Sequence, residues 1–129
     1  MTETNILICT DLDRTLLPNG SEPESPQARD RFARVASQPS VVLAYVSGRH
    51  RELVQEAIRH YGIPRPDWVI GDVGTTIYQV TPQAWHHWPQ WQQEIAGDWG
   101  GSTATDVHSL LQPIEGLTLQ EAAKQNRFK

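Results

Sequence analysis

The expected fold of this chain is decided by one stretch, Ile6–Leu17, which reads ILICTDLDRTLL. Its first four residues are apolar and mostly branched, which is typical of a strand buried on both faces. Two acids, Asp11 and Asp13, follow at the carboxyl end of this strand, where open α/β sheets place their ligands. Neighbouring carboxylates at a buried strand end are costly unless a cation offsets their charge, and oxygen ligands suit Mg²⁺. The stretch therefore predicts a magnesium site.

Length and charge set the class of protein. The chain has 129 residues, enough for one modest domain, and a formal net charge of -4, so neither nucleic acid nor an anionic membrane is an expected partner. The single cysteine, Cys9, lies in the first apolar run, where we expect a buried, inert thiol. The polar start, MTETN, has no basic signal region, and no apolar run reaches the length of a membrane span. These features predict a cytoplasmic protein.

Apolar runs alternate with helical patterns over residues 6–80. This order predicts an α/β fold with a parallel sheet and right-handed crossovers. A helix is expected from Ser25-Pro26 to Ala36, with an apolar face at Ala28, Phe32, Val35 and Ala36, and a second from His50 to Tyr61, ended by Gly62. The predicted strands are 6–9, 41–46 and 68–70, with a further strand or hairpin arm over 75–80.

The sequence changes character at Thr81. Four of the five tryptophans lie between Trp85 and Trp99, and we interpret them as core residues rather than a sugar platform. Helical spacing over 84–95 predicts a helix that Pro89 opens or kinks. A short helix over 105–111, an extended segment over 114–119 and a helix-favouring end are also expected. The adjacent His86 and His87 show no metal spacing and are predicted at the surface.

Three predicted strand ends carry the chemistry. Asp11 has the position of a nucleophile, because carboxylates form aspartyl-phosphate intermediates. Asp13 is placed to give a proton to a leaving alcohol and to take one from water. Ser47 follows the second parallel strand, so its hydroxyl and the amides of the next helix suit a phosphoryl oxygen.

These residues carry a resemblance to a known family. The segment DLDRT, residues 11–15, resembles the first motif (DxDxT) of the haloacid dehalogenase (HAD) superfamily of phosphohydrolases, and VSGR, 46–49, resembles its second motif. Within it, DVGTTIY, 72–78, is similar to the VGTEI segment of the sucrose-phosphate phosphatase group, and 117–120 with 125–129 are similar to part of its cap domain. The resemblance implies a HAD-like Rossmannoid sheet, present in part, with the beginning of an α+β cap.

The resemblance also implies a set of site residues. Asp11 becomes the nucleophile and Asp13 the general acid/base, with Mg²⁺ bound by the Asp11 side chain and the Asp13 backbone carbonyl. The implied function is a magnesium-dependent phosphatase that hydrolyses a phosphorylated sugar through an aspartyl-phosphate. The phosphate is assigned to Ser47, Gly48 and Thr15, and candidate substrate contacts are Thr75 and Arg49, the latter equally consistent with an ion pair.

The sequence departs from the family pattern in several places. Thr76 replaces the usual acidic residue, so the sugar is not fixed, and His50 stands where a small hydroxyl residue is usual. Nothing matches the later GDxxND-like motif, and Lys124 and Lys129 lie in the cap-like segment, so neither is assigned as the motif lysine. Residues 1–80 are expected to be the N-terminal part of the core and 81–129 the start of a cap. We therefore expect a fragment with poor or no activity and an exposed first strand, open to a chain that supplies the missing strands.

Two other hypotheses remain at this point. The chain is alternatively a non-catalytic truncated module, or the product of a broken gene, with a binding or regulatory role. A receiver domain also gathers aspartates after its first strand, but its phosphoacceptor lies on a later strand, and the sequence around Asp67 and Asp72 lacks that pattern. Mannosylglycerate-phosphate phosphatases and phosphomannomutases share the first two motifs, so the substrate class is set only as a phosphorylated sugar or a similar phosphate ester.

Overall fold

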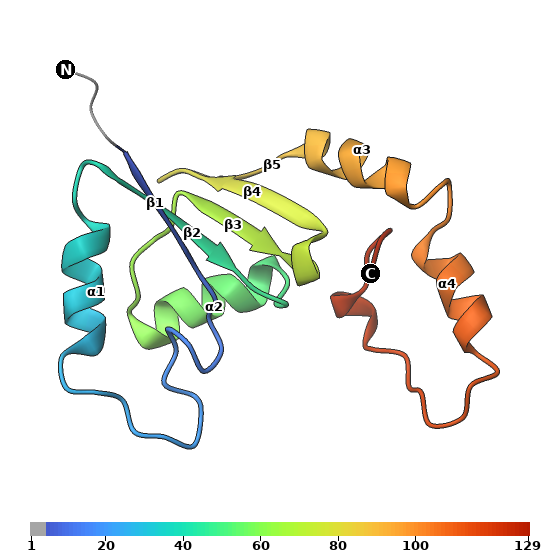
Figure 1. Ribbon diagram of the computed structural model, residues 1–129, viewed down its shortest axis with the longest axis horizontal. Helices are drawn as coiled ribbons and strands as arrows, with labels where there is room; N and C mark the ends of the chain where they lie inside the picture. Colours follow the sequence, from blue (N-terminus) through green and yellow to red (C-terminus); the bar gives the residue numbers. More distant parts are fainter. Residues whose placement is uncertain (1–4) are drawn as a thin grey trace.

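One mixed sheet of five strands organises the molecule (Figure 1). The computed structural model describes residues 5–129, so most of the polar start lies outside the described residues. The strands follow the order β1-β2-β3-β4-β5, parallel from β1 to β3 and antiparallel from β3 to β5. They are β1 (Ile6–Thr10), β2 (Val41–Val46), β3 (Trp68–Gly71), β4 (Thr76–Val80) and β5 (Trp85–His87). The predicted α/β class is confirmed, and the hairpin arm at β4 makes the sheet mixed rather than parallel throughout.

Two helices, α1 (Ala28–Ala36) and α2 (Arg51–Tyr61), pack on one face of the sheet. In β2 the side chains of Leu43 and Tyr45 point to this face and are buried, as period-two alternation requires. Val54 of α2 is fully buried in the same cluster. Gly62 ends α2 in the left-handed conformation, as predicted, with φ of 60°. The core thus sits beneath the parallel strands and fixes the loops that follow them.

Strand β1 lies at the edge of the described sheet. It pairs with β2 in parallel, with Ile6 opposite Val41. Ile6 is 53% exposed and Leu7 62% exposed, and Cys9 is exposed as well. The predictions of a strand buried on both faces and of a buried thiol are therefore wrong for this chain, because Leu7 and Cys9 alternate with Ile8, which packs against the core, and point to the opposite face of the sheet from α1 and α2. The expected exposed apolar edge is confirmed.

Two helix starts differ from the sequence prediction. Helix α1 begins at Ala28, because Ser25 lies in a turn whose carbonyl accepts the Ala28 amide, and Val35 is exposed rather than packed. The helix predicted from the apolar spacing over 84–95 is wrong before Pro89, since residues 85–87 form β5 and pair with β4. Pro89 instead opens α3 (Pro89–Asp98) at its first turn, where the missing amide costs nothing.

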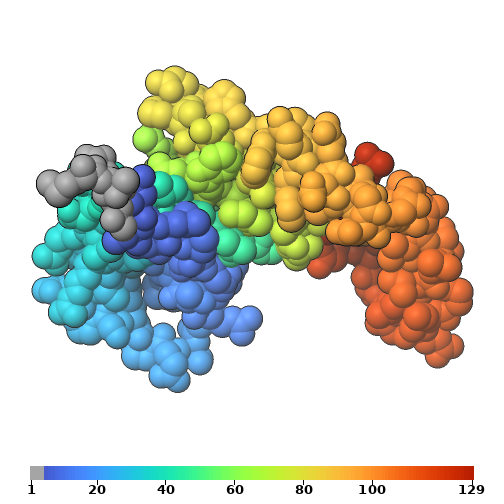
Figure 2. All heavy atoms as spheres, turned by 45° about the horizontal axis from the view of Figure 1, so that its top comes forward, coloured from blue at the N-terminus to red at the C-terminus, as the bar shows by residue number. Residues whose placement is uncertain are grey.

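The remainder of the chain forms a lobe beside the sheet. It contains α4 (Ala104–Leu111), capped by Thr103, and a short 3-10 turn, η2 (Ala122–Lys124). The predicted extended segment over 114–119 forms no strand, and the helix-favouring end forms only η2. Figure 2 shows this orange-to-red lobe at one end of the molecule. The final residues return toward the 3-10 turn η1 (Asp72–Gly74), which follows β3 (Figure 1).

Four of the five tryptophans are partly buried rather than enclosed in the core, and Trp85 packs against the core cluster. Trp88 is 44% exposed and its ring lies 5.7 Å from that of Trp68, and Trp99 lies 5.2 Å from the ring of Phe128. The paired histidines of β5 are exposed, as predicted.

Across residues 5–129, none of the helices is long and apolar enough to cross a bilayer.

Candidate active site

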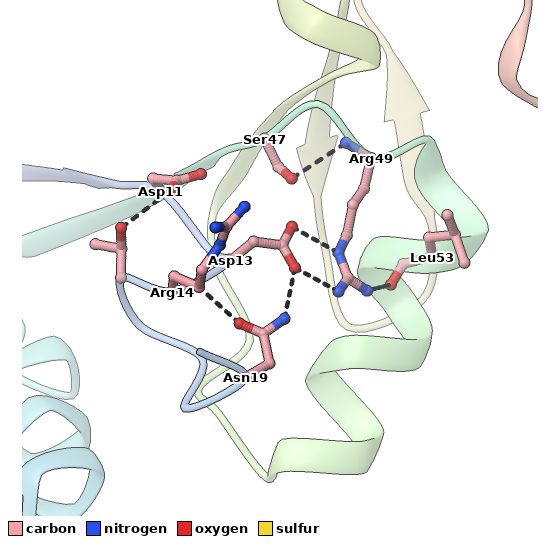
Figure 3. A network of polar contacts seen from close by, with 8 residues as sticks. Asp11, Asp13, Arg14, Asn19, Ser47, Arg49 and Leu53 are labelled. Carbon is pink, nitrogen blue, oxygen red and sulfur yellow. Dashed lines mark hydrogen bonds and ion pairs between the residues drawn. The ribbon is translucent and has the colours of Figure 1, made fainter. Parts of the chain in front are cut away.

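The candidate site lies at the carboxyl ends of β1 and β2 (Figure 3). Because these strands are parallel, the loops after them meet at the same edge of the sheet. Asp11 and Asp13 come from the loop after β1, and Ser47 and Arg49 come from the loop between β2 and α2. The structure therefore brings together the residues of both motifs that the sequence singled out.

Asp11 is presented to solvent by a tightly fixed loop. Its Oδ2 accepts a hydrogen bond of 3.0 Å from Thr15 Oγ1. The Leu12 carbonyl accepts the amides of Thr15 and Leu17 at 3.2 and 2.8 Å, and the Leu12 and Leu17 side chains are buried beneath the loop. An exposed carboxylate on such a rigid turn has the accessibility that a nucleophile needs. Thr15 thus supports this carboxylate through its hydroxyl.

Asp13 is held by a bidentate ion pair. Arg49 Nε donates to Oδ2 at 2.9 Å and Nη2 to Oδ1 at 2.6 Å, while Asn19 Nδ2 donates to Oδ1 at 2.7 Å (Figure 3). A third nitrogen of Arg49 donates to the Leu53 carbonyl at 3.3 Å, which ties the pair to α2. These bonds, with that from Arg49 as the main cause, lower the pKa of Asp13 below its ordinary value despite partial burial. Asp13 is thus held in its ionised, carboxylate form.

Arg49 therefore makes an ion pair inside the site. Its side chain is 24% exposed and that of Asp13 is 39% exposed, so the pair is partly buried. A bidentate guanidinium fixes the plane of its carboxylate, which an ammonium does not do. The pair consequently fixes the orientation of the Asp13 carboxylate.

Ser47 and Gly48 form the loop expected to receive phosphate. Ser47 is 5% exposed, its amide donates to Ile70 O at 2.9 Å, and its Oγ accepts from the Arg49 amide at 3.1 Å. Its hydroxyl hydrogen is available to an oxygen of a ligand. At Gly48 an added Cβ would lie 3.4 Å from Val73 Cγ1, so the loop passes close to the turn after β3.

Thr75 is placed differently from the other predicted site residues. It follows η1, and its hydroxyl donates to Asp72 O at 2.8 Å while accepting from Asn126 Nδ2 at 2.9 Å. None of these bonds reaches Asp11 or Asp13. The structure gives Thr75 a part in joining the end of the chain to η1.

The sequence did not identify two residues at this edge of the sheet as site residues. Asp72 follows β3, is 8% exposed, and donates its amide to Arg49 O at 2.9 Å. Lys129 places Nζ 3.7 Å from Asp72 Oδ1 and 3.1 Å from the Gly48 carbonyl. The position of Asp72 at a third strand end was a visible signal, whereas Lys129 lies 81 residues beyond Gly48 and carried none.

Two oxygen donors at this edge suit a magnesium ion. The exposed Asp11 carboxylate and the Asp13 backbone carbonyl are hard donors of the kind Mg²⁺ prefers. Within residues 5–129, no three His, Cys, Asp or Glu side chains gather into a metal-binding group. The Asp13 carboxylate is itself occupied by Arg49 and Asn19. The two donors therefore fit an ion that keeps several water ligands.

Comparison with known proteins is consistent with this arrangement. Residues 4–129 match the family model of sucrose-6F-phosphate phosphohydrolase. The chain is 57% identical over 124 residues to a putative HAD-like hydrolase of Nitrosococcus oceani, covering 96% of this chain and 33% of that protein. It is 27% identical over 126 residues to a mannosylfructose-phosphate phosphatase of Agrobacterium fabrum, covering 95% and 47%.

A solved structure shares the fold. The sucrose-phosphatase of Synechocystis, in complex with sucrose and phosphate, superposes with a TM-score of 0.74 at 23% identity, over 95% of this chain and 46% of that one. The chain thus spans about a third to a half of the length of the proteins that it resembles.

Proposed function

Because the chain belongs to the sucrose-6F-phosphate phosphohydrolase family of HAD proteins, we propose that it carries the nucleophile of a magnesium-dependent phosphatase acting on a phosphorylated sugar. One observation carries this proposal: the exposed Asp11 carboxylate stands on a rigid loop beside the Asp13–Arg49 pair and Ser47. The named phosphatase relatives support a sugar phosphate as the substrate class.

The proposed reaction has two steps. A carboxylate oxygen of Asp11 attacks phosphorus, the bond from phosphorus to the sugar oxygen breaks, and Asp13 gives that oxygen a proton. Asp13 then takes a proton from water, whose oxygen attacks phosphorus, releasing inorganic phosphate and the free Asp11 carboxylate. Ser47 Oγ and the Gly48 amide donate hydrogen bonds to phosphoryl oxygens. When bound, Mg²⁺ supplies positive charge that offsets the repulsion between Asp11 and the phosphate.

The Arg49–Asp13 pair favours a second candidate function. A lowered pKa keeps Asp13 ionised, which suits taking a proton from water but opposes giving one to the sugar oxygen. If the pair persists when an ester binds, the chain holds the ester without hydrolysing it. The second candidate is therefore a phosphate-ester-binding module without turnover.

The test compares release and binding of the same esters. Phosphate release from sucrose 6F-phosphate and mannosylfructose phosphate is measured with Mg²⁺ and with a chelator, and ester binding by calorimetry. We expect slow, magnesium-dependent release that Asp11→Asn abolishes. The control Asp98→Asn, an exposed acid at the end of α3, should leave release unchanged. Binding without release supports the second candidate, and the absence of both contradicts each of them.

A further inference from the structure

The last residue of the chain reaches the loop that is expected to hold phosphate. Lys129 Nζ donates to the Gly48 carbonyl at 3.1 Å and lies 3.7 Å from Asp72 Oδ1. The two charged side chains are 13% and 11% exposed, so the Lys129 side chain is largely covered by its neighbours. A lysine side chain packed down next to Ser47 and Gly48, with its ammonium on the Gly48 carbonyl, differs from one that extends freely into solvent.

The position of Lys129 is fixed by the residues before it. Asn126 Nδ2 donates to Thr75 Oγ1 at 2.9 Å, and Asn126 Oδ1 accepts the Phe128 amide at 2.8 Å. Phe128 is 3% exposed and packs against Trp99. These contacts anchor the segment on both sides of η1, so the ammonium is presented to the loop by a bonded and packed backbone.

Fewer N–H donors are occupied on Lys129 than on the neighbouring Arg49. Arg49 uses two nitrogens on Asp13 and a third on Leu53 O. An ammonium has three N–H donors, and the Gly48 carbonyl takes one. The contact with Asp72 is an ion pair at 3.7 Å, longer than a good charge-assisted hydrogen bond. Lys129 can therefore bond an added anion without giving up its present partners.

The turn beneath Lys129 has a strained backbone. Asp72 and Val73 both have positive φ, 52° and 55°, and a β-branched residue rarely adopts this conformation. Hydrogen bonds hold the turn, from the Asp72 amide to Arg49 O at 2.9 Å and from Trp91 Nε1 to Gly74 O at 2.8 Å. Strain of this kind is concentrated at ligand sites, where the surrounding structure maintains it.

A cavity begins at the same place. It has a volume of about 690 Å³, in the range of small-molecule sites, and Val73, Asn126 and Lys129 contribute to its wall. Lys129 thus stands between this cavity and the Ser47–Gly48 loop. A phosphate ester that spans the two would place its charged group at the ammonium and its organic part in the cavity.

We propose that Lys129 is a substrate-binding residue whose ammonium donates to a phosphoryl oxygen of the ester held by Ser47 and Gly48. This inference rests on the proposed function, because it takes the same loop as the phosphate site. It adds a ligand contact from the end of the chain to the contacts of the two motif loops.

The test is a titration with inorganic phosphate in the presence of Mg²⁺. Binding is followed by the ¹⁵N–¹H shift of the Gly48 amide in the 129-residue chain. Lys129→Gln should weaken phosphate binding about tenfold, the value of one hydrogen bond from a charged donor. Lys129→Arg, which keeps the charge, should restore most of it. Arg127→Gln removes the same charge from an exposed neighbour and should have little effect.

A further variant separates binding from a structural role. Asp72→Asn breaks the same ion pair as Lys129→Gln, so both should lower the melting temperature. If Lys129 binds phosphate, Asp72→Asn leaves phosphate affinity unchanged or raises it, because it removes an anion from the site. Equal weakening by the two variants would show that Lys129 acts only as the partner of Asp72.

The remaining outcomes distinguish this inference from the proposed function. If Lys129→Gln binds phosphate like the wild type while Ser47→Ala does not, the inference is overturned and the proposed function stands. If the Gly48 amide of the wild type does not respond to phosphate, the proposed phosphate site fails and the inference fails with it.

Discussion

Replacing Val73 with glycine should cost the protein almost no stability. Val73 has φ of 55° and ψ of 33°, and this left-handed conformation costs an L-residue about 1–2 kcal/mol. Glycine removes that cost but brings an entropic penalty of about 0.5–1 kcal/mol. Val73 is 63% exposed, so losing its side chain forfeits only about a third of the roughly 1.5–3 kcal/mol that full burial of such a side chain supplies. The three contributions nearly cancel, to a net change of at most about 1 kcal/mol in either direction.

The matched control is Val35→Gly in α1. Val35 is 51% exposed but lies in a helix, where glycine relieves no strain. It should therefore lose about 1 kcal/mol or more, from helix propensity and lost burial together. Urea unfolding of both variants measures the difference, with an unchanged m-value as the sign that the unfolded states are comparable.

The result that would refute this reasoning is a Val73→Gly variant as unstable as Val35→Gly. That outcome would mean that the turn is not strained or that the Val73 side chain is essential to packing. If the variant keeps its stability but binds phosphate less tightly, the strain at η1 serves the site rather than the fold. Such a separation is expected where a backbone conformation is maintained for a ligand.

Three further predictions concern other parts of the molecule. Arg49→Met should raise the pKa of Asp13 back toward its usual value near 3.8, because the guanidinium is the main cause of the lowering, and carboxyl ¹³C NMR titration measures it. Leu7→Lys should reduce self-association at high concentration in size-exclusion chromatography, since Leu7 lies on the exposed edge strand, whereas Leu117→Lys, similarly exposed but outside any strand, should not. The folded-state pKa of Asp106 is lowered by its bonds to Thr103, so its cap of α4 is present above the unfolded value and is lost as pH falls through the lower folded value. The protection factors of the first-turn amides of α4, which correct for the pH dependence of the intrinsic exchange rate, should therefore fall between pH 6 and pH 3, and unchanged protection factors would contradict this.

Local sequence signals predicted the parts of the fold that depend on local chemistry. Strand β2 has the predicted bounds, and α2 ends at Tyr61 before Gly62, because a continuous apolar run and a left-handed glycine are strong short-range signals. The sequence also placed Asp11 directly after the first strand, and the structure adds a hydrogen bond to its carboxylate from Thr15, four residues further on. The sequence prediction was wrong at 85–87, where pairing with β4 outweighs a helical spacing of apolar residues.

The contacts that complete the candidate site are long-range, and periodicity carries no information about them. The Asp13–Arg49 pair joins residues 36 positions apart, and the sequence left Arg49 open between an ion pair and a substrate contact. Lys129 and Gly48 are 81 positions apart. Family resemblance identified the acids and the serine but gave no role to Lys129. The structure was needed to show that Arg49 and Lys129 are the cations near these acids and this serine.

The two cations at this edge of the sheet hold their acids in different ways, and the difference bears on how an anion could enter. Arg49 meets Asp13 through two short parallel bonds, so moving it would sacrifice both bonds and the orientation of the carboxylate. Lys129 meets Asp72 at 3.7 Å through a flexible stem, and an ammonium keeps its charge near one partner while turning a donor to another. An incoming phosphoryl group can thus recruit Lys129 at little cost and leave the Asp13–Arg49 pair intact. The Asp13 carboxylate therefore stays oriented and ionised while the site fills, which is the condition that favours binding without turnover.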